Sequence, residues 1–131
     1  FYNAEVVARV KNVLRRAAPS HPVSRLVFPQ IQLVIDLETQ EVNIRNQPIR
    51  LTSREFSLLG LLATRASQNV GYNSIIKHIW GDEEDSPEVR ARIKYLIYLL
   101  RQKLESDPSN PELILNIEGF GYKLQTELNN R

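Results

Sequence analysis

The alternation of apolar and polar residues predicts a long amphipathic helix at residues 86–105 and a β-hairpin after it. One helix face is apolar at i, i+4, i+7 and i+11, the spacing of a buried stripe, with Ile93, Ile97, Leu100 and Leu104. At about 100° per residue the opposite face carries Ala91, Lys94, Tyr95, Tyr98 and Gln102. Residues 113–117 and 121–125 flank a glycine turn and predict the hairpin strands. This combination suits insertion into a DNA major groove, and an ordinary amphipathic surface helix is the alternative.

Residues 1–18 also have the pattern of a helix. Val6, Val10 and Val13 lie on one apolar stripe. Pro19 and Pro22 end this helix and predict a linker at residues 19–25. The segment shares no obvious core with the rest of the chain, so we expect it to be the last helix of a preceding domain.

Short strands replace helical periodicity in residues 26–51. Apolar alternation predicts strands at residues 30–37, 41–45 and 48–51, separated by polar turns. These segments predict a small antiparallel meander.

Two shorter helices are predicted between the meander and the long helix. Thr52 and Glu55 match a capping box, and the helix starting there turns Phe56, Leu59, Leu62, Ala63 and Ala66 inward. Asn73 or Ser74 is expected to cap the next helix, which ends at Gly81. The order predicts an α+β fold, a winged helix-turn-helix with an N-terminal antiparallel β-meander, three helices and a C-terminal β-hairpin wing.

The amino-acid composition limits which classes of protein and which kinds of site are possible. The 131 residues are enough to bury a real core. The absence of Cys excludes disulfides and thiolate metal sites. No apolar run reaches the ~18 residues of a membrane span, and no signal-peptide pattern opens the chain. Because the chain starts at Phe1 and contains no Met, we expect it to be part of a longer, cytoplasmic protein.

Charge is unevenly distributed, so the whole-chain net charge of +2 is misleading. Residues 1–25 carry a net charge of +4, which leaves −2 for the rest of the chain. Affinity for nucleic acid must therefore come from local placement of charge or from dimerisation.

No catalytic, metal or cofactor site is predicted. His21 and His78 are far apart, and neither has a Ser or an acid arranged around it. The acidic run at residues 82–85 lacks the spaced ligands and the glycine of a Ca²⁺ loop. The glycines at 119 and 121 form a turn and not a phosphate cradle, because no strand-to-helix transition surrounds them.

Four motifs occur together in one order and spacing. They are PIRLTSREFSLL at residues 48–59, IWG at 79–81, LRQKLE at 100–105 and GFGY at 119–122. With them the chain resembles, over residues 26–126, the C-terminal effector domain of OmpR/PhoB-type response regulators, which are bacterial two-component transcription factors. Residues 127–131 are left as a tail. Residues 1–16, with ARV at 8–10 and LRR at 14–16, are similar to the last helix of the family's receiver domain.

The resemblance implies a phosphorylation-controlled regulator that binds double-stranded DNA. A sensor kinase would phosphorylate an Asp of the receiver domain, the receiver would form a homodimer, and paired effector domains would bind direct-repeat half-sites. In relatives the loop before the recognition helix can contact RNA polymerase, and here that loop contains Asp82, Glu83, Glu84 and Asp85. No membrane partner is implied.

The long helix would be the recognition helix and the hairpin the wing. The candidate DNA contacts on the helix are Arg90, Arg92, Lys94, Tyr95, Tyr98, Arg101 and Gln102, and those on the wing are Phe120 and Lys123. Arg101 can instead bridge to Glu105, and the ring of Tyr95 can instead cover apolar neighbours. Trp80 and Tyr122 are expected in the core.

Several positions depart from the family pattern. Ala91 stands where the family usually has an early Arg, Lys94 where it has an Asp, and Leu96 where it has a His. Tyr98 and Leu99 occupy positions that are often Arg in relatives, and Glu118 occupies the position of the wing that is often Arg. Because each lost bidentate base contact removes roughly 1–3 kcal/mol of discrimination, a different sequence preference is expected. The alternative is a degenerate winged helix that acts mainly as a protein–protein interaction module and binds DNA weakly.

Overall fold

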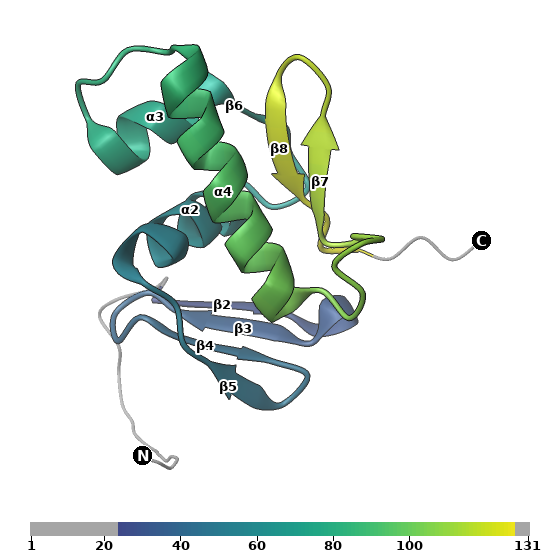
Figure 1. Cartoon of the computed structure of the whole chain (residues 1–131). Helices are drawn as coiled ribbons and strands as arrows, with labels where there is room; N and C mark the ends of the chain where they lie inside the picture. The colour runs from purple at the N-terminus through teal and green to yellow at the C-terminus, as the bar shows by residue number, and fades with distance from the viewer. Residues whose placement is uncertain (1–23, 128–131) are drawn as a thin grey trace.

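The computed structural model describes residues 24–127, in which a four-stranded sheet is followed by three α-helices and a C-terminal hairpin, with one short strand between the first two helices (Figure 1). The predicted order of strands, helices and hairpin is confirmed. The predicted helix at residues 1–18, most of the linker at 19–25 and the end of the tail lie outside the described residues.

The N-terminal sheet is an antiparallel meander of four strands, one more than predicted. Its strands pair in chain order: β2 (Arg25–Phe28), β3 (Leu33–Asp36), β4 (Glu41–Ile44) and β5 (Gln47–Ile49). The predicted strand at residues 30–37 is wrong in its first half. Pro29 opens a 3-10 turn there, and Gln32 leaves it with a left-handed φ of 56°. This turn reverses the chain and creates the extra strand β2.

The first helix, α2 (Ser53–Thr64), begins with the predicted capping box. The Thr52 hydroxyl accepts the Glu55 N–H at 3.2 Å, and Glu55 Oε1 accepts the Thr52 N–H at 3.0 Å. Phe56, Leu59, Leu62 and Ala63 are buried as predicted, whereas Ala66 lies past the end of α2 and is only half-buried.

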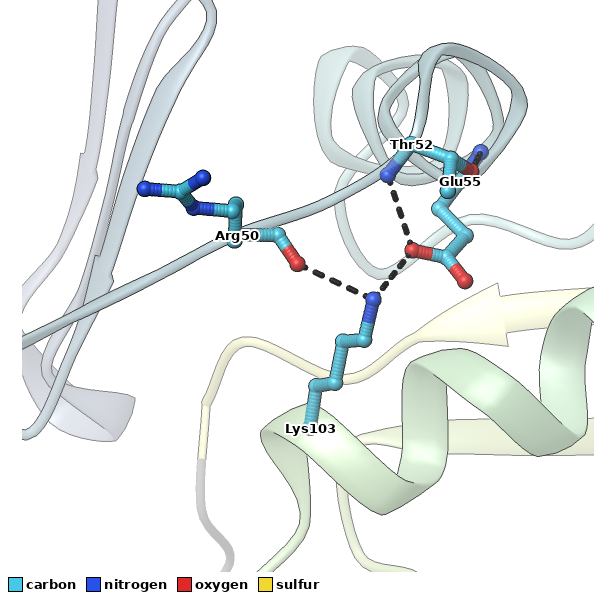
Figure 2. Close-up of polar contacts among 4 residues, drawn as sticks. All are labelled: Arg50, Thr52, Glu55 and Lys103. Carbon is cyan, nitrogen blue, oxygen red and sulfur yellow. Dashed lines mark hydrogen bonds and ion pairs between the residues drawn. The ribbon is translucent and has the colours of Figure 1, made fainter.

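Glu55 also ties α2 to the third helix, α4 (Pro87–Leu104). Lys103 Nζ lies 2.6 Å from Glu55 Oε1 and donates to the Arg50 carbonyl oxygen at 2.9 Å, contacts that are drawn as dashed lines in Figure 2. Glu55 is only 1% exposed, so this ammonium supplies the charge that a buried carboxylate requires. The contact fixes the C-terminal half of α4 against the start of α2.

The middle helix, α3 (Tyr72–Trp80), starts earlier than predicted. Neither Asn73 nor Ser74 caps it; Gly71 is the N-cap residue and makes no side-chain capping bond. Instead, the Tyr72 N–H donates to the Phe120 carbonyl at 3.0 Å. Contact with the wing therefore sets the start of α3. Its end at Gly81, with φ 84°, is as predicted.

The C-terminal sheet has the strand order β6-β8-β7, formed by β6 (Val70–Gly71), β8 (Gly121–Leu124) and β7 (Ile114–Ile117). The predicted hairpin is confirmed, with Ile117 opposite Gly121 and Ile114 opposite Leu124. The two-residue strand β6 was not predicted. The hairpin lies beside the N-terminal half of α4, whereas the four-stranded sheet lies beyond its C-terminal end (Figure 1).

The core lies between the helices and both sheets. All four residues of the predicted stripe on α4 are at most 2% exposed. Tyr122 is buried as predicted and meets Tyr72 edge-on, with ring centroids 5.9 Å apart. Burial, and then the neighbouring Tyr72, raise the pKa of Tyr122 to about 12. Trp80 was predicted in the core but is only partly buried.

Candidate nucleic-acid interface

The outer face of α4 is exposed along its length. Ser86 caps the helix by accepting the Val89 N–H at 3.2 Å, and Pro87 occupies the first turn. The buried stripe then turns the opposite face outward, and Ala91, Lys94, Tyr95, Tyr98 and Gln102 are all exposed, as predicted. Leu96 belongs to the core at 8% exposed, and Leu99 is half-buried.

Two arginines near the start of α4 are paired with the acidic loop. Arg90 donates through Nε and Nη2 to the two carboxylate oxygens of Asp85, both at 2.8 Å. Arg92 Nη1 lies 2.7 Å from Glu83 Oε1. The hydrogen-bonded guanidinium lowers the pKa of Asp85, and the same pair raises the pKa of Arg90. Both ion pairs are exposed, so they are weak and can exchange with other anions.

Three arginines near the start of α2 and α4 lie over aromatic rings. The Arg90 guanidinium lies 4.1 Å from the ring centroid of Tyr72. Trp80 packs against the core but is only partly buried, and the guanidinium groups of Arg54 and Arg92 lie 5.4 and 5.6 Å from its ring centroid. Arg54, Arg92 and Trp80 line a hollow of about 630 Å³ between the start of α2 and α4.

Arg101 faces the wing. Its Nε and Nη2 donate to the Ile114 carbonyl oxygen at 3.2 and 2.8 Å. The alternative of a bridge to Glu105 is wrong, because the Glu105 carboxylate accepts the backbone N–H groups of residues 112–114. Arg101 and Glu105 thus both join α4 to the start of β7.

Tyr95 and Tyr98 form the largest apolar feature of the outer face. They are 61% and 54% exposed. Their rings are stacked, with centroids 6.3 Å apart and planes 17° from parallel. Lys94 forms no ion pair with any residue of the described range 24–127.

The tip of the wing projects next to the start of α4. Phe120 is 48% exposed, and Glu118 is exposed in the turn before it, whereas Lys123 on β8 is half-buried. A hollow of about 380 Å³ lies between the wing tip, the start of α3 and the start of α4, and Phe120, Arg90 and Asp85 are among the residues that line it. Sequence reasoning placed Arg90 and Phe120 in one interface but missed Asp85 as the partner of Arg90.

Residues 24–127 offer neither a candidate metal site nor a candidate membrane span. That segment contains no group of three or more His, Cys, Asp or Glu side chains that could hold a metal ion. It also contains no helix long and apolar enough to cross a membrane.

Comparison with known proteins agrees with the geometry. The family model described as "Transcriptional regulatory protein, C terminal" matches residues 46–124. The chain is 39% identical over 129 residues to the probable transcriptional regulator ycf27 of Guillardia theta, covering 95% of this chain and 51% of that protein. The chain spans about half the length of the curated relatives it matches.

Solved structures give the same result. The response regulator DrrB, a Thermotoga maritima OmpR/PhoB homologue, is 30% identical with a TM-score of 0.62, over 72% of this chain and 42% of DrrB. The DNA-binding domain of CpxR from E. coli is 28% identical with a TM-score of 0.65, over 75% of this chain and 94% of that domain.

Proposed function

The chain belongs to the family of C-terminal DNA-binding domains of OmpR/PhoB-type transcriptional regulators, and from this we propose that it is the sequence-reading part of a two-component response regulator. The family is one of transcriptional regulators and not of enzymes. In the proposed function, α4 enters the major groove, the wing contacts the adjacent backbone, and two copies occupy direct-repeat half-sites.

The observation that carries the proposal is the exposed outer face of α4. An amphipathic surface helix needs only solvated polar residues there, but this face combines an unpaired lysine, two exposed aromatic rings and an amide. Cations bind phosphates, and amides and apolar groups read base edges. The exposed Phe120 lines a hollow together with Arg90, so the tip of the wing lies beside the start of the same helix.

Selection from random duplexes with the 131-residue chain tests the proposal. We expect enrichment of a direct repeat whose half-sites lie about one helical turn apart. Failure to enrich any site, with only salt-sensitive background binding, would contradict the proposal and favour the protein-interaction alternative.

Removing the charge of Lys94 is expected to weaken binding to the selected site. Lys94→Ala should lower the affinity about tenfold and reduce the salt slope by about one, because one contact to a DNA phosphate is lost. Titration at two salt concentrations measures both quantities. Arg25→Ala is the matched control, since it removes an exposed cation from the sheet beyond the other end of α4. An equal loss of affinity in Lys94→Ala and Arg25→Ala would count against a contact between Lys94 and DNA.

Removing the acid that pairs with Arg90 is expected to strengthen binding. In Asp85→Asn the guanidinium no longer has a carboxylate competing with DNA phosphate, so the affinity should rise several-fold and the salt slope should steepen by about 0.9. Glu41→Gln, on the distant strand β4, removes an exposed acid as the control. Weaker binding by Asp85→Asn would mean that the acid positions Arg90 for contact.

The remaining partners belong to the proposed whole regulator. A receiver domain would supply the homodimer and accept phosphate from a sensor kinase, in the cytoplasm. RNA polymerase is the proposed partner of the acidic loop. Glu83 and Asp85 are engaged by α4, so we propose that the exposed carboxylates of Asp82 and Glu84 make that contact.

A further inference from the structure

The arginines of α4 are all engaged within the protein. Arg90 and Arg92 are paired with Asp85 and Glu83, and Arg101 donates twice to the Ile114 carbonyl. Bidentate contact of an arginine with the O6 and N7 atoms of guanine is the commonest specific contact in the major groove. In the free protein all three guanidinium groups of α4 thus have an internal partner, and an arginine can read guanine only after that partner is displaced.

What this centre offers is an apolar platform. The stacked rings of Tyr95 and Tyr98 support each other, which limits the entropy lost when a partner covers them. Neither side chain has a hydrogen-bond partner within the described residues. Ala91 adds a methyl group one turn before Tyr95, and Gln102 lies one turn after Tyr98.

These four residues form one stripe along the helix. At 1.5 Å per residue, the step from Ala91 to Gln102 covers about 16 Å, or roughly five base pairs. Apolar side chains contact the C5-methyl group of thymine in the major groove, and Gln donates to N7 and accepts from N6 of adenine. The chemistry of the stripe thus matches A·T pairs better than G·C pairs.

We propose that the stacked Tyr95–Tyr98 pair reads thymine methyl groups in the major groove, with Gln102 on a neighbouring adenine, so that the half-site is rich in A·T pairs. The inference rests on the proposed function and specifies the class of DNA recognised. Tyr95 and Tyr98 contribute specificity, whereas Lys94 contributes affinity without regard to base.

Measuring the affinity for the selected duplex after thymidine is replaced with deoxyuridine tests the inference. The replacement removes the methyl group and leaves every hydrogen-bonding atom in place. The wild-type chain should lose roughly fourfold in affinity for each contacted methyl group. Deoxyuridine outside the half-sites should leave the affinity unchanged, and this duplex controls for altered base stacking.

Protein variants assign the effect to the rings. Tyr98→Ala should reduce the preference for the thymine duplex over the deoxyuridine duplex, and Tyr95→Ala/Tyr98→Ala should abolish it, whereas Tyr98→Phe, which keeps the ring, and Lys94→Ala should keep the wild-type ratio. Circular dichroism checks that the variants keep their helices. Selection of a specific site that binds equally well with deoxyuridine would overturn the inference and leave the proposed function standing. A ratio that survives in Tyr98→Ala would likewise overturn the role of Tyr98. Selection of no site would overturn both.

Discussion

Alanine at Gly121 is expected to destabilise the domain by about 3 kcal/mol or more and to lower Tm by about 10 °C or more. A Cβ atom at this position would collide with the carbonyl oxygen of Val70 and lie 2.9 Å from the Cα of Gly71. Both obstacles are backbone atoms of β6, so no rotamer change relieves them. The sheet must open between β6 and β8, and the wing would lose its anchor beside α3. Thermal unfolding followed by circular dichroism measures the loss.

Gly119→Ala is the matched control two residues away in the same turn. Gly119 has φ 75°, but nothing lies within 4 Å of a Cβ built there. Its alanine variant should cost only about 1 kcal/mol of backbone strain. If Gly121→Ala proved at least as stable as Gly119→Ala, the close contact between β6 and β8 would not constrain position 121.

Elements with strong local signals were predictable from the sequence. The apolar period of α4, the capping box formed by Thr52 and Glu55, and the glycine turn of the wing each depend on residues close together in the chain. Two of the features that were missed, strand β6 and the start of α3, depend on distant contacts. Strand β6 is two residues long and exists because β8 pairs with it, and α3 starts where Phe120 accepts the Tyr72 N–H. No periodicity in residues 70–75 could reveal either contact.

The same distinction applies to the candidate interface. Which α4 residues face outward is set by helix periodicity, and the structure confirms their exposure. Which of them have free charges is not set by periodicity, because Arg92 reaches Glu83 across a loop and Arg101 reaches a carbonyl 13 residues away. Counting positive residues on the helix therefore overestimates how many have no internal partner.

The second large effect is expected at Glu105, which joins the recognition helix to the wing. Its carboxylate is 6% exposed and accepts the N–H groups of Glu112, Leu113 and Ile114 at 2.8–3.2 Å. Glu105→Ala leaves these donors without an acceptor and should cost about 3–4 kcal/mol in the free energy of unfolding. Urea denaturation measures this cost. Glu105→Gln keeps one acceptor oxygen and should lose about half as much.

The loss at Glu105 should appear first at the base of the wing. In Glu105→Ala the amides of Leu113 and Ile114 should exchange hydrogen faster, because the next contact between these segments is Arg101 with the Ile114 carbonyl. Glu112→Ala, which removes an exposed side chain and keeps the backbone donor, should change stability by less than about 0.5 kcal/mol. Equal stabilities of the two variants would mean that water replaces the carboxylate without cost. A clear difference would mean that the buried carboxylate of Glu105 stabilises the junction between the end of α4 and the start of β7.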